Sequence, residues 1–275
     1  MKNCLIVCLL MAALLTVSCA FAAGTGEAYG DMLRAELYLS EGENASIRVP
    51  IITRKPVTQA SYDMWYNQDG EPADAEVKEE IFIDGEHVET EDGWYAYDLY
   101  LHFTMGKKTE SISRIAVKID GELYDLYPEK VELNLITLPD DPKLLRMDQT
   151  LTIPDREEIP FQCNLYADEL CEIKAIRFSA GQTVKELKIN DVVYPNPEQI
   201  GLKVPKDCQA TVEVLLNVPQ EGKDYGSTFF QMETTYQLVK DGTEEKLYSH
   251  SVNLTSFDYD ARLQELQKYI RNKTE

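Results

Sequence analysis

Asp-Gly pairs recur along this chain between short segments in which apolar and polar residues alternate. They occur at 69–70, 84–85, 92–93, 120–121 and 241–242. An Asp-Gly pair favours a two-residue hairpin turn, because both central residues of a type I′ turn need positive φ. Alternation with a period of two places apolar side chains on one face of a strand. The sequence therefore predicts an all-β fold built from antiparallel hairpins.

The turn at 120–121 also predicts a register. A two-residue loop there pairs Val117 with Tyr124 and Ile115 with Leu126, which forms one apolar face. The second half of the chain repeats the alternation from 230 to 238. We therefore expect half-buried strands in both halves, each with one face toward a core.

The strongest break in this pattern is segment 138–142, in which two prolines bracket two acidic residues. Proline cannot donate a backbone hydrogen bond, so neither a helix nor a central strand is expected to continue through this segment. It separates residues 27–138 from residues 143–257, and each part has the size of a small β-sandwich. We expect two tandem immunoglobulin-like sandwich domains. This expectation concerns architecture alone and implies no function.

The first 22 residues differ from the rest of the chain. Lys2 precedes an uncharged apolar run, and Ala20 and Ala22 place small residues where a signal peptidase cleaves. Residues 1–22 are therefore expected to be a signal peptide, with secretion or periplasmic release of the remainder. A lipid anchor at Cys19 is the alternative, although Thr16 stands where a lipoprotein signal has a large aliphatic residue.

The last residues also change character. Residues 258–273 place Leu263, Leu266 and Ile270 at helical spacing. They are expected to form a short amphipathic helix, which either packs on the second domain or docks a partner. No transmembrane helix is expected in the mature chain.

Composition narrows the classes of function. The net charge of −21 disfavours nucleic acid and anionic lipid as partners. The three histidines, His87, His102 and His250, do not have the spacing of metal ligands, and no nucleophile motif is present. We therefore expect no enzymatic activity and no cofactor, with calcium as the one ion left open.

Two weaker site predictions concern acids and thiols. Asp140 and Asp141 at the domain junction could bind calcium through their carboxylates, or they could simply be acids of an exposed linker. Cys163 and Cys171 could form a disulfide across a hairpin if residues 166–168 make its loop. The alternative for these cysteines and Cys208 is three unbridged thiols.

An aromatic-rich stretch between residues 62 and 103 contains both tryptophans of the chain. Aromatic rings on a β-sandwich either fill its core or form a flat platform for a ligand. The candidate ligand-binding residues are Trp65, Tyr66, Trp94 and Tyr100. Both interpretations stay open at this point.

These observations predict an exported, non-catalytic binding or adhesion protein that acts by surface recognition. Its partner would be a protein or a polysaccharide outside the cytoplasm. The alternative is a structural or assembly component of a bacterial envelope or secretion system. Such a component would dock its partner through the C-terminal helix or a sheet edge.

Overall fold

The computed structural model describes residues 28–29, 33–53, 55–77, 82–83, 88–89, 95–151, 158–217 and 227–255. In these ranges the regular elements are β-strands in several mostly antiparallel sheets, so the predicted all-β class is confirmed. None of the described residues belongs to a helix long and apolar enough to cross a bilayer. The predicted signal peptide at 1–22 and helix at 258–273 lie outside the described residues.

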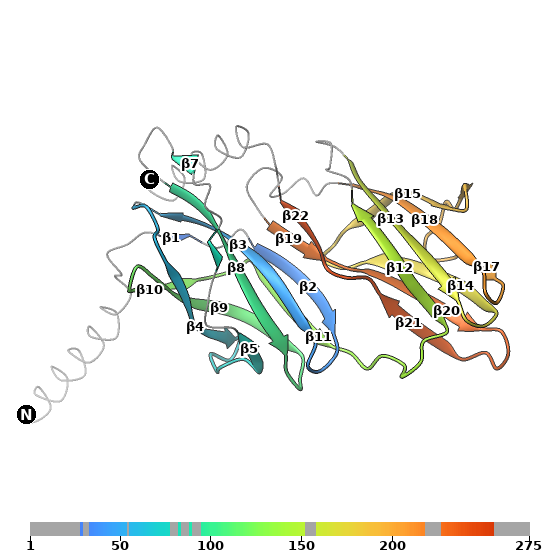
Figure 1. Ribbon diagram of the computed structural model, residues 1–275, viewed down its shortest axis with the longest axis horizontal. Helices are drawn as coiled ribbons and strands as arrows, with labels where there is room; N and C mark the ends of the chain where they lie inside the picture. The colour runs from blue at the N-terminus through green and yellow to red at the C-terminus, as the bar shows by residue number, and fades with distance from the viewer. Residues whose placement is uncertain are drawn as a thin grey trace, which may run out of the picture.

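Sheets A and B enclose a common hydrophobic core and form the first unit (Figure 1). The strands of sheet A are β1 (Ala28–Tyr29), β3 (Asn44–Thr53), β5 (Ala75–Val77), β6 (Phe82–Ile83), β7 (Val88–Glu89) and β8 (Tyr95–Met105). The strands of sheet B are β2 (Leu33–Leu39), β4 (Ala60–Asn67), β9 (Glu110–Ile119), β10 (Glu122–Leu126), β11 (Lys130–Leu135), β19 (Ser227–Phe230) and β22 (Val252–Thr255). Sheet A has the order β1-β3-β8-β5, and sheet B the order β10-β9-β11-β2-β19-β22 with β4 paired to β9.

Sheets C and D enclose another core and form the second unit. The strands of sheet C are β12 (Leu144–Leu151), β13 (Glu158–Ala167), β15 (Thr183–Ile189), β16 (Val192–Val193) and β18 (Gln209–Asn217). The strands of sheet D are β14 (Cys171–Phe178), β17 (Leu202–Val204), β20 (Met232–Leu238) and β21 (Glu244–Tyr248). Their orders are β12-β13-β18-β15-β16 and β17-β14-β20-β21.

The hairpin of β9 and β10 has the register that its Asp-Gly turn predicts. Val117 pairs with Tyr124 and Ile115 pairs with Leu126. The two turn residues have φ of 49° and 86°, so the conformation that Asp-Gly favours is the one adopted. Short-range turn chemistry is therefore sufficient to align these two strands.

The alternating segment from 230 to 238 is divided between the two units, which its sequence does not indicate. Its first residue, Phe230, is the last residue of β19 of sheet B, and the chain resumes as β20 of sheet D after Gln231. Phe229 packs in the core of the first unit, whereas Phe230 packs in the core of the second. Successive side chains of a strand point to opposite sides, so these two neighbours at the end of β19 enter different cores.

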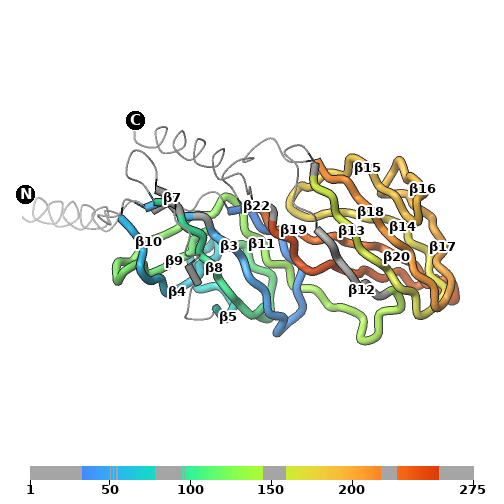
Figure 2. The backbone as a smooth tube through the Cα atoms, turned by 45° about the horizontal axis from the view of Figure 1, so that its top comes forward, coloured from blue at the N-terminus to red at the C-terminus, as the bar shows by residue number. Residues whose placement is uncertain are grey.

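The pairing of β19 gives the two units a shared sheet in addition to the linker at 138–142. β19 runs parallel to β2, with Ser227 opposite Leu33 and Phe229 opposite Ala35, and β22 pairs with the other side of β19. Figures 1 and 2 both show β19 and β22 between the other strands of the first unit and the second unit. That segment 138–142 separates two folding units stays a prediction. The structure adds that β19 connects the two units at a second place.

Candidate functional site

The structure places Trp65 in the core of the first unit. Its side chain is 1% exposed, and its ring packs against Phe103 at 5.0 Å and against Tyr62 at 6.4 Å between ring centroids. Burial also raises the pKa of Tyr62 to about 12. Trp65 is thus a core residue, and its ring is not available to a ligand at the surface. Trp94 lies outside the described residues.

Tyr66 and Tyr100 do not share a face. Tyr66 is on β4 of sheet B, where the Arg114 guanidinium carbon lies 3.7 Å from its ring centroid. Tyr100 is on β8 of sheet A between the core residues Leu99 and Leu101, so it points away from the core. Two tyrosines on the outer faces of opposite sheets cannot form one platform. The three predicted aromatic residues that the structure describes are therefore not brought together as a single site, and for Trp94 the binding role stays a prediction.

The acid pair at the linker does not gather metal ligands around it. Asp140 and Asp141 are exposed, and the Asp141 carboxylate forms an ion pair with Lys143. Among the described residues, no group of three or more His, Cys, Asp or Glu side chains is arranged to hold a metal ion. A calcium site at this junction stays a prediction that the geometry of the described residues does not support.

The predicted disulfide between Cys163 and Cys171 is wrong, because these two residues are not bridged. Cys163 lies on β13 of sheet C and Cys171 on β14 of sheet D, and the loop between the strands crosses from one sheet to the other. The two strands therefore do not form the hairpin that the prediction required. The Cys171 thiol donates to the carbonyl of Glu169 at 3.1 Å, and burial raises its pKa to about 11.

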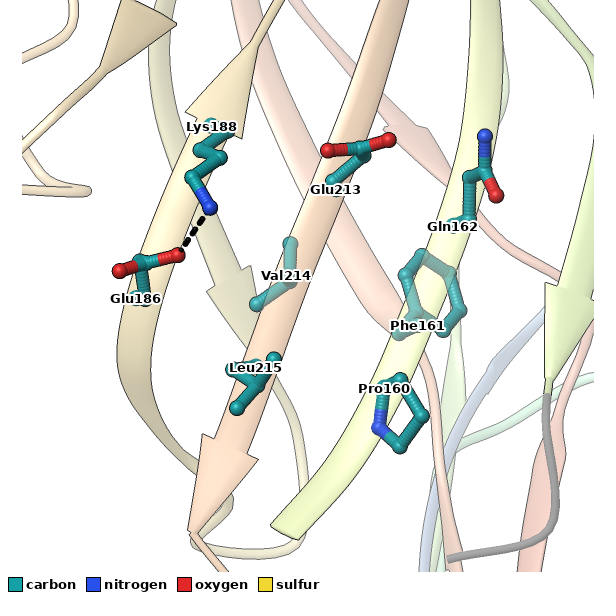
Figure 3. Close-up of a pocket in the computed structure, with 8 residues that line it drawn as sticks. All are labelled: Pro160, Phe161, Gln162, Glu186, Lys188, Glu213, Val214 and Leu215. Atoms are coloured by element: carbon teal, nitrogen blue, oxygen red, sulfur yellow. Dashed lines mark ion pairs between the residues drawn. The ribbon is translucent and has the colours of Figure 1, made fainter. Parts of the chain in front are cut away.

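A shallow hollow of about 290 Å³ lies on the outer face of sheet C (Figure 3). It spans three adjacent strands, β13, β18 and β15, and it is open to solvent. The residues that line it are Pro160, Phe161, Gln162, Glu186, Lys188, Glu213, Val214 and Leu215. Phe161 and Val214 are core residues whose strands form the floor, and the other six side chains point outward from the core.

Irregular strand positions lie on both sides of the hollow. The register of β15 against β18 shifts between Val184 and Glu186, so Lys185 is an extra residue in β15. Such a bulge bends a strand and redirects its side chains. On the other side, Pro160 lies one residue beyond the last described pair of β13 with β12, where its missing N–H is tolerated.

The charges in the hollow are partly matched. The Lys188 amine lies 2.5 Å from the Glu186 carboxylate, and this hydrogen bond and ion pair raise the pKa of Lys188 above its ordinary value. Glu213 occupies the central strand, opposite Gln162 on one side and Lys188 on the other. The three strands thus present an amide, a carboxylate and an ammonium group in one row.

Polar side chains continue along β13 and β18 beyond the hollow. The Gln209 Nε2 donates to Asn164 Oδ1 at 2.7 Å, and the Thr211 hydroxyl donates to the same oxygen at 3.0 Å. Tyr166 is opposite Gln209 and lies between the core residues Leu165 and Ala167, so it points to the same outer side. We call this surface the sheet C face, and its members are Pro160, Gln162, Asn164, Tyr166, Glu186, Lys188, Gln209, Thr211, Glu213 and Leu215.

None of these residues is singled out by the sequence. Exposed Gln, Glu and Lys residues are ordinary on the solvent side of a strand, and no short motif joins residues 162, 188 and 213. Only the pairing of β13 and β15 with β18 brings them into one row. The bulge in β15 has no signal in the sequence either, because this strand contains neither glycine nor proline.

Comparison with known proteins adds little. No protein-family model matches the sequence, and no curated protein matches it. A solved structure of ACE, an MSCRAMM of Enterococcus faecalis that "binds its ligands by the collagen Hug Model", is 11% identical in sequence with a TM-score of 0.28. That match covers 80% of this chain and 92% of the other. A similarity this low supports no inference about function.

Proposed function

We propose that this chain is an exported, non-catalytic binding protein that recognises a macromolecular partner through an outer sheet face. The observation that carries the proposal is the open hollow on the sheet C face. It combines apolar side chains, Pro160 and Leu215, with hydrogen-bonding side chains from three strands. A shallow open surface of this kind suits a partner that is laid across it more than a small molecule that must be enclosed.

The lining of the hollow favours binding over chemistry. Its ionisable side chains are Glu186, Lys188 and Glu213, and the first two neutralise each other. General acid–base catalysis relies on groups whose pKa is tuned by burial and by neighbouring charges, in a site from which water is excluded. The open hollow leaves the Glu213 carboxylate in contact with water.

The strand orders support the finer proposal that both units are immunoglobulin-like sandwiches. When β16 and β17 are left out and the other strands of the second unit are lettered along the chain, β12-β13-β18-β15 has the order A-B-E-D, and β14-β20-β21 has the order C-F-G. In the first unit, β1-β3-β8-β5 and β4-β9-β11 have the same two orders when β2, β6, β7 and β10 are left out. Sandwiches of this type commonly present their outer faces and loops to partners, and the signal peptide predicted at 1–22 supports export of such a protein.

Retention and turnover measured together test this proposal. The chain without residues 1–22 is immobilised and exposed to polysaccharides and to extracellular proteins of defined composition. We expect saturable retention of at least one polymer, which is recovered chemically unchanged. Release of new reducing ends or peptide fragments from the retained polymer would show an enzyme, and failure to retain any polymer would rule out the binding role.

A further inference from the structure

We propose that the sheet C face binds an extended, uncharged glycan chain. The inference rests on the binding function proposed above and names the ligand and its location. Its binding surface lies on the second unit and is polar and aliphatic, since the three described aromatic candidates of the first unit are not brought together.

The hydrogen-bonding groups of the face match sugar hydroxyls. Each hydroxyl both donates and accepts, so it is satisfied by an amide or by a neighbouring acceptor and donor. Gln162, Glu213 and Lys188 provide an amide, an acceptor and a donor on three adjacent strands. Adjacent strands lie about 4.8 Å apart, so the row spans roughly 10 Å across the sheet.

Apolar groups flank this polar row. Pro160 and Leu215 pair with each other directly beside it, and Tyr166 lies farther along β13 on the same side. Sugar rings expose C–H groups as well as hydroxyls, and these pack on aliphatic surfaces and aromatic rings. On β13, Pro160 and Tyr166 lie on either side of the polar Gln162 and Asn164, and this mixed surface fits a polymer with the same mixed character.

The charge of the molecule favours an uncharged polymer. The chain has a net charge of −21, which repels acidic polysaccharides and nucleic acids. Lys188, the positive charge of the hollow, is matched by Glu186 and so leaves no unmatched cation for a carboxylate or sulfate group. The remaining charge is that of Glu213, whose oxygens accept hydrogen bonds from neutral hydroxyls.

The face is also ordered before a ligand arrives, and it is long. Hydrogen bonds already hold Asn164, Thr211 and Gln209 in place, so less side-chain entropy is lost on binding. Pro160 and Tyr166 are six positions apart on β13, a distance of about 20 Å along a strand. This length accommodates a chain of sugars, and the inferred ligand is therefore a polymer.

Affinity electrophoresis tests the inference with three neutral polysaccharides, β-glucan, xylan and mannan, and with polygalacturonate as the acidic comparison. We expect at least one neutral polymer to retard the chain and polygalacturonate to have no effect. The double variant Gln162→Ala/Glu213→Ala removes two exposed side chains from the face and is expected to bind about tenfold more weakly or worse.

The second unit offers a matched control on its opposite side. Glu172 and Gln237 form the same type of cross-strand pair on sheet D, so Glu172→Ala/Gln237→Ala removes equivalent groups from the other face. This control is expected to bind as the unchanged chain does. If both double variants bind equally well, the inferred location is wrong while the binding function stands.

The variant Glu213→Gln separates a glycan from a basic protein partner. It keeps a hydrogen-bonding group and removes the charge, so neutral glycan is still bound, whereas binding of a polylysine probe at this face is weakened. If the unchanged chain binds polylysine and no neutral glycan, and Glu213→Gln weakens that binding, the inferred ligand is wrong and the binding function stands. If neither probe is bound and the retention assay described above also finds no polymer, both proposals are wrong.

Discussion

At the scale of single residues, Gln231 holds the two units together. It is 2% exposed, and its Oε1 accepts from the Tyr38 N–H at 2.5 Å while its Nε2 donates to the carbonyls of Tyr38 at 3.2 Å and Ser249 at 2.8 Å. Its backbone N–H donates to the Ser179 hydroxyl at 2.9 Å. One side chain thus satisfies backbone groups of both units in a place where water is largely excluded.

We predict that Gln231→Leu lowers the free energy of unfolding by about 2–3 kcal/mol, because it leaves buried backbone groups of Tyr38 and Ser249 without their side-chain partner. Urea unfolding followed by tryptophan fluorescence measures the change. Gln68→Ala provides a control, since Gln68 is exposed and its bond to the Ser111 hydroxyl is a surface contact. The control should stay within about 0.5 kcal/mol. A Gln231→Leu protein as stable as the unchanged chain would show that the joint depends on other contacts.

At the scale of elements, the turn between β9 and β10 also aligns β4. The Asp120 carboxylate accepts from the Thr58 N–H at 3.1 Å and from the Gln59 N–H at 3.0 Å, and it also accepts from the Thr58 hydroxyl. Burial alone would raise the pKa of Asp120, but these hydrogen bonds outweigh it and hold the pKa below its ordinary value. The turn residue therefore stabilises the segment that leads into β4 through its ionised form.

Because the pKa of Asp120 is lower in the folded state than in the unfolded state, its ionised carboxylate stabilises the fold. This stabilisation is fully present above the unfolded pKa of about 3.9 and is lost as the pH falls through the folded pKa. We predict that Asp120→Asn, which keeps a residue that tolerates positive φ, lowers stability at pH 7 by about 1 kcal/mol. The difference from the unchanged chain should be smaller at pH 3 than at pH 7, because the stabilisation declines once the pH is below the unfolded pKa. Urea unfolding at the two pH values measures it, and an equal loss at both would show that the charge of Asp120 has no part.

At the scale of the whole molecule, the two units are one assembly that the chain crosses more than once. It leaves the first unit after β11 and returns as β19, and Phe229 on that strand lies in the first core. β2 therefore depends on a strand that follows it by nearly 200 residues for its second neighbour. Residues before the linker lack this strand when they are separated from the rest.

We predict that the two halves stay together after the linker is cut. A protease site placed within 138–142 allows cleavage of the folded full-length chain, and the products should elute together in size-exclusion chromatography. They should separate only in denaturant, because β19 still pairs with β2 and Gln231 still bonds to Tyr38. Two separate folded fragments in native buffer would show that 138–142 is a true domain boundary and that the shared sheet is weak.

What the sequence determined by itself is local. The all-β class and the register of Val117 with Tyr124 follow from turn chemistry and period-two alternation, which act over a few residues. Alternation does not determine which face of a strand is buried or in which core, so the sequence left Trp65 either as a core residue or as part of a ligand-binding surface.

The tertiary structure decided the rest. The burial of Trp65, the separation of Cys163 from Cys171 on different sheets and the row of Gln162, Glu213 and Lys188 all depend on which strands become neighbours. So does the bond between Tyr38 and Gln231, residues 193 positions apart. Such pairings are selected by the free energy of burying whole sheet faces together, and no short segment of the chain contains that information.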